Sequence, residues 1–182
     1  MSARTASKLE DSGTTGTPRR LALASYGGDG DAKAFFEGRI RDPRTVALAL
    51  VQLSRVVGSR FYVPPAMRDR ILREADPIVT FGGDVLRFEG FSSCASAYAR
   101  LDVDSAGLEI AHGSRGTTNV DSNEPLRAAL AGVRDGDALD LRVDPASVAI
   151  AHVKGEATPT RVVEDKVELP RRWLRGLVEV QA

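Results

Sequence analysis

Apolar and polar residues alternate through the middle of the chain, a pattern typical of half-buried β-strands. Within residues 85–91, Leu86 and Phe88 share one face, while Arg87 and Glu89 share the other. Turns rich in glycine and aspartate separate stretches of this kind. Further strands are predicted at residues 77–81, 97–103, 108–112, 138–143, 148–153 and 161–169. The pattern therefore predicts a mainly antiparallel sheet of meanders and hairpins.

Helices are predicted from capping residues and apolar spacing. Asp42 followed by Pro43 is typical of a helix start, and the mostly apolar residues after it predict a buried helix that ends at Gly58. Asn123 or Glu124 caps a second helix over about 124–134, whose apolar stripe faces the sheet. Shorter helices are expected at residues 32–40, from Pro64 onward and at about 170–176. Helices are thus expected mainly in the N-terminal part of the chain, and strands mainly in the remainder.

This order of elements predicts an α+β fold with an N-terminal helical section and a helix packed on the sheet. Residues 1–20 have almost nothing to bury and are expected to form a disordered tail. Residues 21–182 are expected to form one domain, mainly helical over 21–76 and mainly β over 77–182. We find no internal repeat, and nothing recurs as strand-helix-strand units.

Composition narrows the classes of protein to which the chain can belong. Its 182 residues hold 25 Lys+Arg and 25 Asp+Glu, so a formal net charge of zero gives no overall attraction to nucleic acid or an anionic membrane. The longest apolar run, Val46–Val51, is far shorter than the ~20 residues of a membrane span. One cysteine excludes an internal disulfide, which favours a reducing compartment. We predict a cytoplasmic protein.

The residues that could carry chemistry form no recognisable active site. Cys94 and His112, with Asp102 or Asp121, match no known nucleophile motif, and Cys94 is expected to be a small buried or half-buried thiol. One cysteine and two histidines are too few for a zinc site, so we predict no metal and no cofactor. His152 is expected to be an ordinary sheet residue. The chain is therefore predicted not to be an enzyme.

The stretch Gly113–Asn123 is unusually polar, with Val120 as its one apolar side chain. It is either a surface loop or a strand edge whose side chains form hydrogen bonds. Its glycines and arginine faintly suggest a phosphate cradle, but the sequence lacks both GxxxxGK[ST] and GxGxxG. The candidate binding residues in and beside this stretch are Arg100, Asp102, Arg115, Thr117, Thr118, Asn119, Asp121 and Asn123.

Two alternative functions stay open at this point. Arginine clusters could bind nucleic acid, especially where they flank Trp173, although an apolar stripe favours a core position for that indole. The arginines of this alternative are Arg41, Arg44, Arg171, Arg172 and Arg175. A hydrolase would instead need a cleft where Glu89, Arg100, Asp102 and Asp121 meet with perturbed pKa values.

Three segments resemble the amino-terminal region of bacterial SWIM zinc finger proteins: RFEGFSSCASAYARLDV, GTTNVDSNEPLRAAL and KVELPRRWLRGLVEVQ. The similarity extends over roughly residues 20–182. Family members tend to carry a Cys-Cys pair where this chain has Cys94 followed by Ala95, and the CxC…CxH finger is absent. SWIM proteins bind nucleic acid or proteins through that finger. The resemblance thus implies an accessory domain that presents the finger or docks a protein partner. If the polar stretch 113–123 is exposed and rigid, it would be the docking face.

Overall fold

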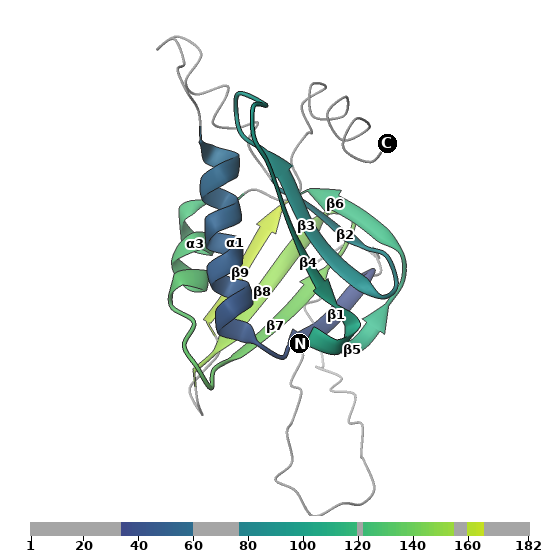
Figure 1. Ribbon diagram of the computed structural model, residues 1–182. Coiled ribbons are helices and arrows are strands. Elements are labelled where there is room, and N and C mark those ends of the chain that lie inside the picture. The colour runs from purple at the N-terminus through teal and green to yellow at the C-terminus, as the bar shows by residue number, and fades with distance from the viewer. Residues whose placement is uncertain (1–33, 60–76, 120–121, 155–159, 166–182) are drawn as a thin grey trace, which may run out of the picture.

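The computed structural model describes residues 34–59, 77–119, 122–154 and 160–165 (Figure 1). Its helices are α1 (Pro43–Gly58) and α3 (Glu124–Ala131). Its strands are β1 (Phe36–Ile40), β2 (Ile78–Phe81), β3 (Val85–Phe91), β4 (Tyr98–Asp104), β5 (Leu108–Gly113), β6 (Gly116–Asn119), β7 (Ala138–Val143), β8 (Ser147–Val153) and β9 (Thr160–Asp165). A short 3₁₀ turn, Ser105–Gly107, joins β4 to β5. The predicted tail and the helices expected after Pro64 and at 170–176 lie outside the described residues.

The strands form two antiparallel sheets, which confirms the α+β prediction. The five-stranded sheet has the order β5-β1-β7-β8-β9, and the four-stranded sheet has the order β4-β3-β2-β6. The two helices lie side by side along one side of the sheets (Figure 1). Both begin as predicted: Asp42 accepts a hydrogen bond from the Thr45 N–H at 3.2 Å, and Asn123 accepts one from the Leu126 N–H at 3.2 Å.

The two halves of the chain have the same order of elements. β1, α1, β2, β3 and β4 correspond to β6, α3, β7, β8 and β9. In each half the first strand pairs with the first meander strand of the other half, β1 with β7 and β6 with β2. Each helix packs on the last two strands of its own half. The prediction that no strand-helix-strand unit repeats is therefore wrong: the halves repeat the order and pairing of their elements, which does not require similar residues.

One core joins the sheets and the helices. Phe36 of β1 and Phe81 of β2 are buried, and their ring centroids lie 5.0 Å apart. Val57 of α1 and Leu139 of β7 belong to the same core cluster. Since β1 and β6 each cross to the sheet of the other half, neither half can bury its apolar face alone.

Residues 36–40 form a strand, which corrects the helix predicted over 32–40. The spacing of Phe36 and Ile40 suits either a helix or a strand. The strand forms because β1 lies between β5 and β7 and pairs with both. Gly38 permits this close pairing: a Cβ there would lie 2.7 Å from the carbonyl oxygen of Glu109. The described part of 21–76 is thus not purely helical.

The predicted meander divides between the two sheets. β2, β3 and β4 follow one another in the four-stranded sheet, whereas β5 crosses to the edge of the five-stranded sheet. On β5, Leu108 is buried, but Ile110 and His112 are exposed. The pairing of β5 with β1 skips Ala111, a bulge that interrupts this sheet edge. Residues 116–119 form β6, so the polar stretch is in part a strand edge rather than a loop.

Candidate functional site

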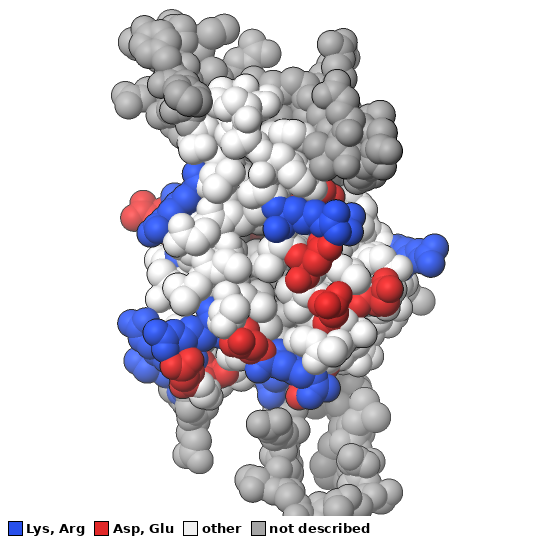
Figure 2. Space-filling model, in the orientation of Figure 1, with Lys and Arg blue, Asp and Glu red and all other residues white. Residues whose placement is uncertain are grey.

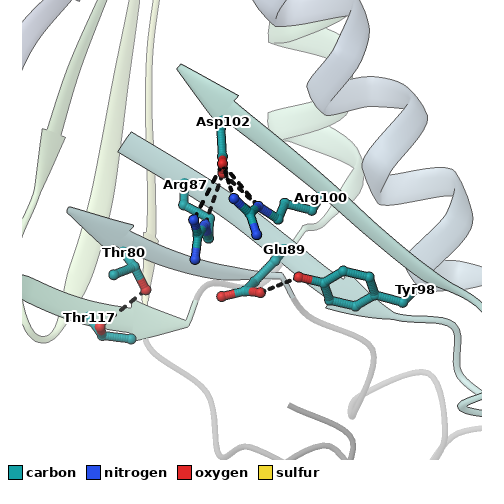
Figure 3. Close-up of polar contacts among 7 residues, drawn as sticks. All are labelled: Thr80, Arg87, Glu89, Tyr98, Arg100, Asp102 and Thr117. Carbon is teal, nitrogen blue, oxygen red and sulfur yellow. Dashed lines mark hydrogen bonds and ion pairs between the residues drawn. The ribbon is translucent and has the colours of Figure 1, made fainter. Parts of the chain in front are cut away.

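The outer face of the four-stranded sheet carries an ordered row of polar side chains (Figure 3). The strand register places Asp102, Arg87, Thr80 and Thr117 opposite one another, from β4 through β3 and β2 to β6. Together with Arg100, the neighbour of Asp102 on β4, we call these residues the polar row. It contains three of the predicted binding residues, Arg100, Asp102 and Thr117.

Asp102 is held between two arginines. Its Oδ1 accepts a hydrogen bond from Arg87 Nε at 2.9 Å, and both of its carboxylate oxygens lie 3.0 Å from Arg100 Nε. The hydrogen bond from Arg100, followed by that from Arg87, lowers the pKa of Asp102 to about 2. The bonds to Asp102 in turn raise the pKa of both arginines. Both guanidinium groups are therefore held in place by Asp102.

The two threonines complete the row at its other end. The hydroxyl oxygens of Thr80 and Thr117 lie 3.1 Å apart and share a hydrogen bond. Thr117 is exposed on β6, and the exposed Arg115 lies two residues before it. Within the described part of the chain, Arg115 makes no hydrogen bond and no ion pair.

Beside the row lies a buried carboxylate. Glu89 points to the outer face of β3 but is only 4% exposed. Tyr98 of β4 donates a hydrogen bond of 2.5 Å to Glu89 Oε2 (Figure 3). Burial, and then this hydrogen bond, raise the pKa of Tyr98 to about 12. Tyr98, Thr80 and Arg87 were not among the predicted site residues, because only the register brings them to this face.

Three other predicted residues hold the fold together instead. The Thr118 hydroxyl is buried and donates to the carbonyl of Pro145 at 3.2 Å, and Asn119 is only 2% exposed. Asn123 caps α3 with its side-chain oxygen and donates from Nδ2 to Glu164 of β9. Thr118 and Asn119 are buried, and Asn123 is half-buried between the start of α3 and β9. Asp121 lies outside the described residues.

The nucleophile set of Cys94, His112 and Asp102 is not brought together, whereas Glu89, Arg100 and Asp102 of the hydrolase alternative are neighbours on β3 and β4. Cys94 is exposed in the β3–β4 connection, which corrects the expected buried thiol. His112 lies on the edge of the other sheet. Asp102 has a pKa of about 2, which would make it a weak base at neutral pH. Among the described residues, no three His, Cys, Asp or Glu side chains are grouped to hold a metal ion.

His152 has a partner that the sequence did not suggest. Its Nε2 lies 2.7 Å from Asp137 Oδ2, and both side chains are nearly buried. Asp137 also accepts a hydrogen bond from the Arg134 N–H, so the pair fastens the turn after α3 to β8. The hydrogen bond with His152 lowers the pKa of Asp137. The contact explains His152 as a structural residue.

Arg41 and Arg44, the two arginines of the nucleic-acid alternative that the structure describes, each lie beside an acidic side chain. Arg41 forms an ion pair with Glu109 at 3.5 Å, and Arg44 forms one with Asp135. Blue and red side chains lie interspersed on the face seen in Figure 2, without a broad area of one sign. Arg171, Arg172 and Arg175 lie outside the described residues, so binding by a joint arginine surface stays a prediction.

Comparison with known proteins adds little to this picture. No protein-family model and no curated protein matches the chain. Among solved structures, it is similar to DNA polymerase III subunit beta from Borrelia burgdorferi in complex with a natural product. The identity is 8%, the TM-score is 0.48, and the match covers 76% of this chain but 32% of that chain. No helix in the described ranges is long and apolar enough to span a membrane.

Proposed function

We propose that this chain is a non-catalytic interaction domain that docks a protein partner on the outer face of its four-stranded sheet. The observation that carries the proposal is the polar row. Its side chains come from four neighbouring strands and hold one another in place through hydrogen bonds and ion pairs. Such a surface presents oriented hydrogen-bonding groups of the kind that protein interfaces contain.

The chemistry of the row suits a protein surface. Arginine is enriched among the interface residues that contribute most of the binding energy. Its planar guanidinium forms several hydrogen bonds and also stacks on aromatic side chains. Arg87 and Arg100 are already oriented by Asp102, so ordering them on binding costs little. Arg115, which pairs with no residue in the described ranges, adds a cation just before β6 of the same sheet.

The resemblance to the amino-terminal region of SWIM zinc finger proteins supports the same role. In such proteins the finger makes the principal contacts, and a domain without it would serve as an accessory that docks a partner. The partner would be cytoplasmic, as the sequence predicts for this chain.

The proposal is tested by comparing two triple variants in affinity capture from native lysate. The first replaces Arg100, Arg115 and Thr117 by Ala on the proposed face. The matched control replaces two arginines and a threonine of the helical layer, Arg44→Ala, Arg127→Ala and Thr45→Ala. Both variants must first melt cooperatively. We expect a protein that wild type and control retain to be lost from the face variant.

The remaining outcomes are equally decisive. Equal recovery with both variants would refute docking on this face. Material that a nuclease releases would favour the nucleic-acid alternative, and affinity should then fall steeply with salt.

A further inference from the structure

One side of β4 is an open strand edge. β4 stands at the end of its sheet, next to β3, and no strand in the described ranges pairs with its other side (Figure 1). Its seven residues make it longer than the edge strands β5, β6 and β9. The register between β3 and β4 runs without a shift, whereas β5 carries a bulge. A long edge strand without a bulge or a proline can pair with another strand.

The hydrogen bonds between β3 and β4 decide which backbone groups face the open side. The N–H of Ser92 donates to the carbonyl of Ala97 at 2.8 Å, and bonded pairs of this kind recur at every second residue of an antiparallel ladder. Ala99, Leu101 and Val103 therefore direct their backbone groups toward β3. The residues between them direct their backbone N–H and C=O groups to the open edge: Tyr98, Arg100, Asp102 and Asp104.

This edge is complementary to itself about a two-fold axis through Leu101, the middle residue of β4. When a second β4 pairs with it antiparallel about that axis, all seven residues overlap, and the outward backbone groups meet one another. Arg100 then lies across from the partner's Asp102, and Tyr98 lies across from the partner's Asp104. Sliding the strands by two residues in either direction would place two Arg100 or two Asp102 side chains opposite each other, and like charges in that position are destabilising.

We propose that a second copy of this chain docks on β4, so that the two four-stranded sheets join across a two-fold axis. Arg100 of each copy pairs with the partner's Asp102, so each copy supplies an arginine to the polar row of the other. Leu101 and Ala99 also become covered. Both are half-buried on the inner face of β4, so the packing of α1 leaves that side of the edge partly open.

The first test measures the mass of the full chain by sedimentation velocity, at concentrations from about 1 to about 200 μM. We expect the mass to rise with concentration from 19.5 kDa toward twice that value. A mass that stays at 19.5 kDa over the whole range would overturn the inference.

Two charge-reversed variants then locate the interface. Arg100→Glu and Asp102→Lys each place like charges across the two-fold axis, so each variant alone should dimerise at least about tenfold more weakly than wild type. When the two variants are mixed, every charged pair across the axis is again of opposite sign, and dimers should form about as tightly as in wild type. Both variants must first melt cooperatively.

Matched controls carry the same changes away from β4. Arg115→Glu lies just before β6, and Asp84→Lys lies in the turn between β2 and β3, where both native side chains are exposed. Both controls should dimerise as wild type does. The assignment to β4 is wrong if the charge-reversed variants dimerise as tightly as these controls, or if mixing them restores nothing.

A cysteine placed on the two-fold axis tests the register without changing a charge. Leu101 alone lies across from itself, in a non-hydrogen-bonded pair whose Cα atoms are about 4.5 Å apart, a distance that a disulfide spans. In a Cys94→Ser background, Leu101→Cys should give a disulfide-linked dimer on mild oxidation. Ala99→Cys, which lies across from the partner's Val103, should not. Equal cross-linking by both variants, or none by Leu101→Cys, would refute pairing about Leu101.

Self-association and docking of a protein partner can fail separately. A chain that stays monomeric but captures a partner through the polar row would remove the β4 interface and leave docking intact. A dimer that depends on Arg100 and Asp102 but captures no partner would leave the β4 interface and remove the support for docking.

Discussion

Replacing Arg39 would leave a buried aspartate without its countercharge. Arg39 of β1 lies directly across from Asp140 of β7, and its Nε and Nη2 donate to the two carboxylate oxygens at 2.6 and 2.9 Å. The two side chains are 18% and 8% exposed. This bidentate pair joins β1 of one half to the sheet of the other half. The hydrogen bond to Asp140 also raises the pKa of Arg39.

The magnitude follows from the burial of Asp140. Removing one partner of a buried ion pair typically costs 3–5 kcal/mol, because the remaining charge loses its compensation. Since Arg39 is 18% exposed, water can partly replace it, and we take the lower end, about 3 kcal/mol. At about 2–4 °C per kcal/mol for a domain of this size, Arg39→Met should melt about 6–12 °C below wild type.

The assay is reversible thermal and urea unfolding, with Arg44→Met as matched control. Arg44 pairs with Asp135, but their side chains are 47% and 78% exposed. Water screens that pair, so its loss should cost about 0–1 kcal/mol. The double variant Arg39→Met/Asp140→Leu should recover most of the stability, since an apolar pair replaces the ionic one. If the two single variants melted within about 2 °C of each other, the burial argument would be refuted.

Two further predictions concern packing and acid stability. Gly116→Ala should lose about 1–3 kcal/mol in urea unfolding, because its Cβ would lie 2.4 Å from the Phe35 ring, whereas Gly58→Ala, with nothing within 4 Å, should be neutral or slightly stabilising. Equal stability of these variants would contradict the close approach. Asp102 has its pKa lowered from 3.8 to about 2, so its stabilising contribution is complete above about pH 4 and is lost as the pH falls toward 2. Melting curves at pH 6 and pH 2 should therefore show Asp102→Asn less stable than wild type at pH 6 and nearly equal at pH 2, and a constant difference would refute the assignment.

The candidate site was only partly predictable from the sequence. Arg100, Asp102 and Thr117 were identified from polarity, and they do lie on one exposed face. Thr118 and Asn119 were identified for the same reason but are buried. Thr118 points to the opposite face of β6 from Thr117, because side chains alternate along a strand. Asn119 lies at the end of the same edge strand, where its surroundings differ from those of Thr117. Polarity indicates that a side chain will form hydrogen bonds, but it does not tell whether the partner is water or the protein.

The sequence by itself determined the local elements of this protein. Both described helices begin at the predicted caps, and the strands over 85–91 and 138–143 have the predicted bounds, because capping and alternation act between residues close in the chain. Only the tertiary structure decided how the elements combine. The exchange of β1 and β6 between the halves, the strand at 36–40 and the alignment of the polar row all depend on pairing between distant residues. Strand alternation fixes which face a residue occupies, but which strand lies next to it is chosen by the packing of the whole core.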